Sequence, residues 1–129
     1  MADDAFVEDR DAVIERARDA GLTHALCILA ADNALESERA QQLSAIWPAL
    51  RFSTGVHPHQ AGQFAGRESE VGQLVRTALA ANSASRTIGE IGLDYHYDFA
   101  PKAVQHEVFR VQIQLAREAE LAASAVRTS

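Results

Sequence analysis

Segments with helical periodicity alternate with segments of strand periodicity along this chain, and this alternation is the strongest constraint on its fold. Four segments repeat apolar residues at the spacing of one helix face, and three shorter segments are apolar throughout or alternate with a period of two. Strands separated by helices run parallel and are joined by right-handed crossovers, so the sequence predicts an α/β architecture. The predicted helices cover residues 3–20, 33–47, 68–81 and 101–121, and the predicted strands cover 23–29, 50–56 and 87–91.

The two ends of this pattern predict a part of a larger structure. The first helix has no strand before it, and the segment 122–129 shows neither strand period nor a helix cap. Three parallel strands would leave two open sheet edges, which natural proteins avoid.

The nearly continuous apolar run 23–29 predicts a strand buried on both faces, with His24 and Cys27 in the core.

Composition limits the functional classes. The 129 residues are 47% hydrophobic, which suffices for one core, and they carry 12 basic and 18 acidic side chains for a net charge of −6. This excess of acid argues against binding nucleic acid along a broad basic face, but not against holding phosphates through metal ions. The single cysteine, Cys27, excludes an internal disulfide, and we expect a reducing, cytoplasmic compartment. The acidic start argues against a signal peptide, and no apolar run approaches the roughly 18 residues that a membrane span needs.

Glu90 is the first candidate site residue. It follows a short apolar strand and lies between Gly89 and Gly92, which allow backbone or ligand to approach closely. Parallel α/β folds carry their chemistry at the carboxyl ends of strands, where a carboxylate suits a hard divalent cation. A surface acid in a glycine-rich turn is the alternative.

Histidines at the end of the preceding strand form a second candidate group. His57 and His59 flank a proline, and two imidazoles in such a turn suit a metal, a phosphate or a carboxylate; for His59, simple solvation is the alternative.

Asp94 either orients the site or caps a turn. Asp94, His96 and Asp98 alternate like a small metal loop, but the glycine and glutamate of a calcium-binding EF-hand are missing. His106 lies among charges in the last helix and is expected on the surface, and the sequence contains no catalytic Ser/His/Asp pattern, phosphate-binding loop or CxxC pair.

Several of these motifs occur together in a known order. From about residue 3 to Leu121 the chain resembles the TatD family of metal-dependent deoxyribonucleases, which are TIM barrels of the metallo-dependent hydrolase group. The matching pieces are DAF with DR near the start, VIERA before Gly21, GVHPH at 55–59, IGEIGLDY at 88–95, and residues 105–117.

The resemblance implies a barrel with one or two divalent ions at its C-terminal mouth, which activate water to hydrolyse phosphodiester bonds of DNA. Mg, Mn and Zn are not distinguished. In that scheme Glu90 matches the family's metal-ligand glutamate, His57 and His59 match the pair that lines the mouth near substrate phosphates, and Asp94 belongs to the substrate-binding side. No membrane or stable protein partner is implied.

The chain also departs from the family. Family chains usually begin with a strand that ends in a His-x-His pair, and after Leu121 they continue into a strand with a metal-binding histidine. We therefore expect a partial TIM barrel over 3–121 and a divergent tail over 122–129, which a frameshift or an early stop would explain. A barrel needs about 250 residues, so one such chain is not expected to close it. This chain is expected to be inactive alone, because a single carboxylate is a weak site for a cation that takes several oxygen or nitrogen ligands. The alternatives are another hydrolase on the same scaffold, such as an aminoacyl-tRNA deacylase, and a non-catalytic remnant that associates through its open strand edges.

Overall fold

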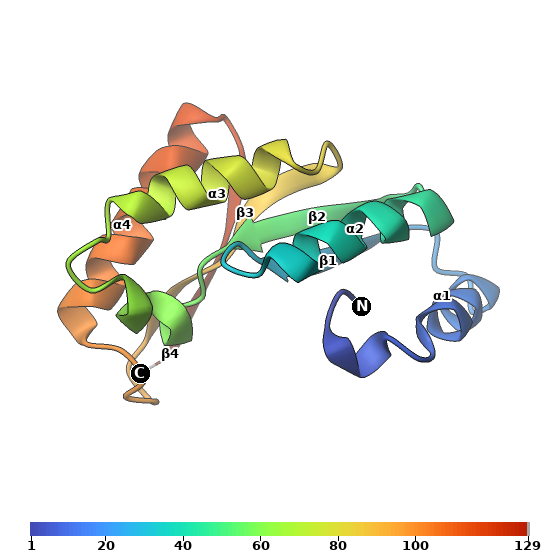
Figure 1. Ribbon diagram of the computed structural model, residues 1–129, viewed down its shortest axis with the longest axis horizontal. Helices are drawn as coiled ribbons and strands as arrows, with labels where there is room; N and C mark the ends of the chain where they lie inside the picture. The colour runs from blue at the N-terminus through green and yellow to red at the C-terminus, as the bar shows by residue number, and fades with distance from the viewer. Residues whose placement is uncertain (129) are drawn as a thin grey trace.

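A parallel sheet with flanking helices forms the centre of the computed structural model, which describes residues 1–128 and confirms the α/β architecture. The strands lie in the order β1-β2-β3-β4, and all neighbours are parallel. In Figure 1 the elements follow one another across the molecule, from α1 at one end to α4 at the other. The strands are β1 (Ala25–Ala30), β2 (Leu50–Gly55), β3 (Ser85–Asp94) and β4 (Ala122–Thr128), and the helices are α1 (Arg10–Asp19), α2 (Ala34–Ile46), α3 (Glu70–Ala80) and α4 (Lys102–Glu118), with 3-10 helices η1 (Asp4–Phe6) and η2 (Pro58–Phe64).

The predicted helices exist, but the first is interrupted. The side chain of Asp3 accepts a hydrogen bond from the backbone N–H of Ala5 and caps η1, so the segment 3–20 begins as a separate short turn, and α1 starts only at Arg10. The side chain of Asn33 caps α2 by accepting from the N–H of Glu36. No helix among residues 1–128 is long and apolar enough to cross a membrane.

All the helices that pack on the sheet cover the same face. Cys27 and Leu29 of β1 and Phe52 of β2 pack with buried residues of α1 and α2, and Ile88 of β3 packs with α3 and α4. The register places Cys27 beside Phe52. Thr54, two residues after Phe52 and so on the same face of β2, lies beside Ile88. These strand residues therefore share one face of the sheet. Helices on only one face are typical of a barrel segment, whereas doubly wound sheets are covered on both.

The opposite face of β1 is open, so the prediction of a strand buried on both faces was wrong. Leu26 and Ile28 are 50% and 52% exposed because no helix covers that face. His24 was expected in the core, but it precedes the strand and is exposed, whereas Cys27 is buried as predicted. In a closed barrel this face would point toward the interior.

The segment after Leu121 forms a fourth strand, which the sequence did not predict. β4 pairs in parallel with β3, from Thr87 beside Ala122 to Asp94 beside Thr128. Most of β4 is exposed, so its sequence carries no alternation of buried and exposed positions. Its pairing depends on backbone hydrogen bonds, which leave no mark on the pattern of side chains.

Candidate functional site

A cavity of about 210 Å³ lies where β1 and β2 end and β3 continues beyond them. It brings together Glu90 and His57, which were predicted from different parts of the sequence. It also brings in Asp32 and Glu36, which the sequence did not indicate as site residues. The lining residues are Ile28, Leu29, Ala30, Asp32, Glu36, Gly55, His57, Gln60 and Glu90.

Glu90 lies within β3 and not at its end, because the strand runs from Ser85 to Asp94. The pairing of β3 with β2 nevertheless ends at Ile88, so Glu90 stands just beyond the three-strand part of the sheet. The register with β4 shifts between Ile88 and Ile91, and the Gly89–Glu90 peptide bond is cis. Glu90 is partly exposed and faces the cavity.

The glycines around Glu90 allow backbone to approach closely, as predicted. A Cβ atom on Gly89 would lie 2.7 Å from the carbonyl oxygen of Ser124, and one on Gly92 would lie 1.9 Å from that of Val126. Gly92 also has a φ of +139°, which side chains disfavour. The approaching backbone belongs to β4. The absence of side chains at these two glycines therefore leaves the space that β4 needs to pair with the segment that carries Glu90.

His57 is partly buried at the carboxyl end of β2. The Val56 backbone before it is held by the buried side chain of Gln112, whose Oε1 accepts from the N–H of Val56 at 2.8 Å. The Nδ1 atom of His57 accepts from the N–H of His59 at 3.2 Å. Burial and the neighbouring His59 lower the pKa of His57, and the opposing charges of Glu90 and Asp94 offset this only in part.

His59 and Asp94 form a hydrogen bond next to this cavity. The Nε2 of His59 contacts Oδ2 of Asp94, whose side chain is only 8% exposed. The Oδ1 of Asp94 accepts from the N–H groups of His96 at 3.0 Å and Tyr97 at 3.3 Å. Hydrogen bonds from Thr128 and then from His59 hold the pKa of Asp94 well below its usual range. Asp94 therefore caps the turn after β3 and also holds the ring of His59.

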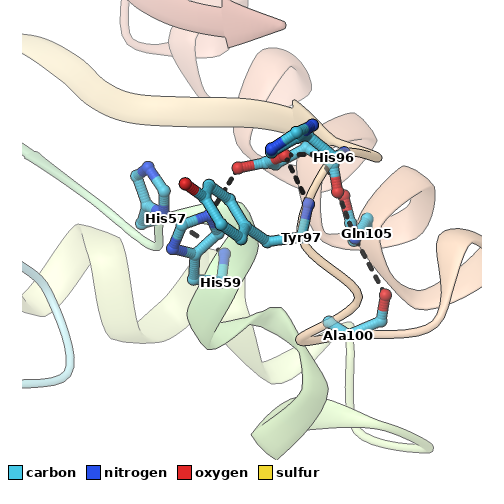
Figure 2. Close-up of polar contacts among 7 residues, drawn as sticks. His57, His59, His96, Tyr97, Ala100 and Gln105 are labelled. Carbon is cyan, nitrogen blue, oxygen red and sulfur yellow. Dashed lines mark hydrogen bonds and ion pairs between the residues drawn. The ribbon is translucent and has the colours of Figure 1, made fainter. Parts of the chain in front are cut away.

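The predicted residues thus form two adjacent groups. Glu90 and His57 face the cavity, whereas His59 and Asp94 lie beside it, and neither borders the cavity. The rings of His57 and His59 join the groups, with centroids 4.4 Å apart in an edge-to-face arrangement. In Figure 2 His59 lies next to both His57 and Tyr97.

Two buried glutamines of α4 support both groups, and sequence reasoning missed them. Gln105 accepts from the N–H of Asp94 at 2.9 Å and donates to its carbonyl at 3.0 Å, and Gln112 makes the equivalent pair of bonds with Val56. One feature of the sequence could have indicated them: the two glutamines are seven residues apart, and this spacing puts both on one helix face with Val108.

The metal-binding side chains of residues 1–128 do not form a complete metal site. Within residues 1–128, no three His, Cys, Asp or Glu side chains come close enough together to hold a metal ion. The loop pattern of Asp94, His96 and Asp98 therefore makes no site, because Asp94 is engaged with backbone N–H groups and His59. A hard cation takes several oxygen or nitrogen ligands, so the described residues fit one ligand of such a site and not the whole of it.

Comparison with known proteins gives a consistent result. The family model described as TatD related DNase matches residues 1–124. The chain is 41% identical over 117 residues to the 3'-5' ssDNA/RNA exonuclease TatD of Pantoea sp. (strain At-9b), a match that covers 90% of this chain and 43% of the relative. The proteins of the same name from Erwinia billingiae (strain Eb661) and Citrobacter rodentium (strain ICC168) are 40% and 34% identical, covering 88% and 90% of this chain. The chain therefore spans less than half the length of these relatives, 41% to 43%.

Proposed function

Because this chain belongs to the family of TatD-related DNases, we propose that it carries part of the active site of a metal-dependent nuclease that hydrolyses phosphodiester bonds. The observation that carries this proposal is the meeting of Glu90 and His57 in one cavity at the strand ends, where parallel α/β enzymes bind their substrates. The relatives named as exonucleases acting on ssDNA and RNA make nucleic acid the preferred substrate class.

In this proposal the cavity residues have different roles. Glu90 supplies one carboxylate ligand to a divalent cation, and water or groups outside residues 1–128 supply the rest. His57, next to it, is held largely neutral by burial, and its Nδ1 already accepts from the N–H of His59, so its Nε2–H donates a single hydrogen bond to a substrate phosphate without adding a full charge. His59 orients toward the same phosphate while Asp94 fixes its ring.

We expect the isolated chain to have no nuclease activity, because one carboxylate binds a divalent cation weakly. Release of nucleotides from a labelled oligonucleotide, with Mg²⁺ or Mn²⁺ added, should not exceed the background without protein. Metal-dependent release that disappears in Glu90→Gln would contradict this expectation.

A chimera tests the nuclease proposal itself. The 117 residues over which the Pantoea relative matches this chain would be replaced by the residues of this chain. We expect the chimera to degrade single-stranded DNA in a metal-dependent way, and Glu90→Gln to reduce this by at least about 100-fold, as is usual for loss of a metal ligand or its orienting partner. Glu38→Gln, which changes an exposed carboxylate on α2, is the matched control. A chimera that folds and cleaves DNA equally well with Glu90→Gln would refute the assignment.

A second candidate is association through the sheet, and the open face of β1 favours it. β1 and β4 are the outer strands among residues 1–128, and β1 carries no charge to discourage pairing. The half-exposed Leu26 and Ile28 add an apolar surface beside that edge. We expect sedimentation to detect self-association that Ile28→Lys weakens and that Leu35→Lys, an exposed site on α2, leaves unchanged. A monomer at all concentrations would count against this candidate.

A further inference from the structure

Two aromatic rings are exposed side by side in the loop between β3 and α4. Tyr97 is 52% exposed and Phe99 is 62% exposed. Their rings are nearly parallel, with an interplanar angle of 10° and centroids 5.4 Å apart. Large rings normally gain stability from burial, so a stacked pair left in solvent offers a flat apolar surface to a ligand.

Contacts with His59 fix this pair relative to the candidate site. The ring of His59 packs edge-on against Phe99 at 4.8 Å and against Tyr97 at 5.6 Å between centroids. His59 in turn contacts Asp94 and the ring of His57, which borders the cavity with Glu90. The rings therefore stand one histidine away from the cavity, at a distance that a neighbouring unit of a polymeric substrate can span.

We propose that Tyr97 and Phe99 form a stacking platform for a base of single-stranded nucleic acid whose backbone reaches the cavity at Glu90. This inference rests on the proposed nuclease function and adds the group that recognises the substrate. Every base has a flat π-face, so stacking on a ring accepts any sequence, but the base must be free of its own duplex. The platform therefore selects single strands without selecting sequence.

The surroundings favour a nucleotide over a purely apolar partner. A hollow of about 290 Å³ adjoins the platform and is lined by Tyr97, Tyr95 and Lys102. The cation Lys102 borders this hollow, and its Nζ lies 4.7 Å from the centroid of the Tyr95 ring. A ring surface next to a cation suits a base joined to a phosphate. Asp94 and Asp98 also border the hollow, and Asp94 is already engaged with backbone N–H groups.

The experiment measures oligonucleotide binding to the full chain without divalent metal, so that no cleavage occurs. The probes are a fluorescent six-nucleotide thymidine strand, an abasic strand with the same backbone, and a duplex, all at low salt. Tyr97→Ala and Phe99→Ala remove one ring each, Tyr97→Phe keeps the ring, and Leu35→Ala changes an exposed apolar side chain elsewhere. Circular dichroism checks that each variant is folded.

We expect Tyr97→Ala and Phe99→Ala each to weaken binding of the thymidine strand about 10-fold, since stacking on one ring contributes at this level. Tyr97→Phe and Leu35→Ala should bind like the wild type, and the abasic strand and the duplex should bind weakly to all variants. If the thymidine and abasic strands bind equally, or if both alanine variants bind like the wild type, the platform is refuted while the nuclease proposal stands. If no strand binds to any variant, the platform is refuted as well, and the nuclease proposal is decided separately by the metal-dependent activity of the chimera.

Discussion

The side chain of Gln112 hydrogen-bonds to both polar backbone groups of Val56, the residue that joins β2 to His57. Its Oε1 accepts from the N–H at 2.8 Å, and its Nε2 donates to the carbonyl at 3.0 Å. Gln105, two turns earlier on α4, makes the same pair of bonds with Asp94. One face of α4 therefore sets the backbone at the ends of two strands, and through it the positions of His57 and Asp94.

This relationship predicts that Gln112→Ala destabilises the fold. The change leaves the buried N–H and carbonyl of Val56 without partners, which should cost about 2–4 kcal/mol of unfolding free energy. Urea unfolding measures it, with Gln73→Ala on the exposed face of α3 as a control expected to stay within about 0.5 kcal/mol of the wild type. Equal costs for the two variants would show that the Gln112 bonds do not stabilise the strand end.

Gly92→Ala is predicted to disturb the pairing of β3 with β4. The added Cβ would lie 1.9 Å from the carbonyl oxygen of Val126, and the φ of +139° adds strain. We expect a loss of about 2–4 kcal/mol, as for overpacking combined with a strained backbone. Gly66→Ala is the control, because Gly66 has a φ of +78° but no atom within 4 Å of the new Cβ. If both variants lose the same stability in urea, the close approach of β4 has no energetic consequence.

The sequence predicted best the residues that belong to an apolar pattern. In the predicted helix 68–81 the apolar spacing joins Val71, Leu74, Val75 and Ala78; Leu74 is partly buried and the other three are buried. In the predicted helix 33–47 the same spacing joins Leu35 with Leu43; Leu43 is buried, but Leu35, in the first turn of α2, is 48% exposed.

The polar residues were harder to place, because their roles depend on partners far away in the sequence. Gln105 and Gln112 lie on the buried face of α4 beside Val108 and Leu115, whose apolar spacing indicated that face but not the glutamines. Their partners lie on β3 and after β2, so helix periodicity alone could not identify them. Glu90 and His57 could be expected to lie near each other because the sequence placed both at strand ends, and parallel strands bring their carboxyl ends to one edge; they line the same cavity, although Glu90 lies within the longer β3. β4 was missed because it is exposed and pairs through its backbone.

The low pKa of Asp94 predicts an acid-dependent loss of stability. Its hydrogen bonds with Thr128 and His59 lower the pKa in the folded state below the ordinary value of 3.8, so the unfolded chain takes up this proton first. The stabilisation is therefore complete above about pH 5 and is lost progressively as the pH falls through 4 and below. Asp94→Asn should lower the urea midpoint at pH 7, and its difference from the wild type should shrink between pH 5 and pH 3. A difference that stays constant over this range would contradict the assignment.

The titration of His57 should report the charge of Glu90 directly. Burial and His59 lower the pKa of His57, whereas the carboxylate of Glu90 raises it, so Glu90→Gln should lower this pKa further. The sign follows because the imidazolium loses an attractive negative charge while its burial is unchanged. NMR detection of the His57 ring protons between pH 4 and pH 8, in metal-free buffer, measures the shift. Glu38→Gln removes a carboxylate from α2 and should leave the titration unchanged. An unchanged or higher pKa of His57 in Glu90→Gln would mean that the two side chains do not share the cavity in solution.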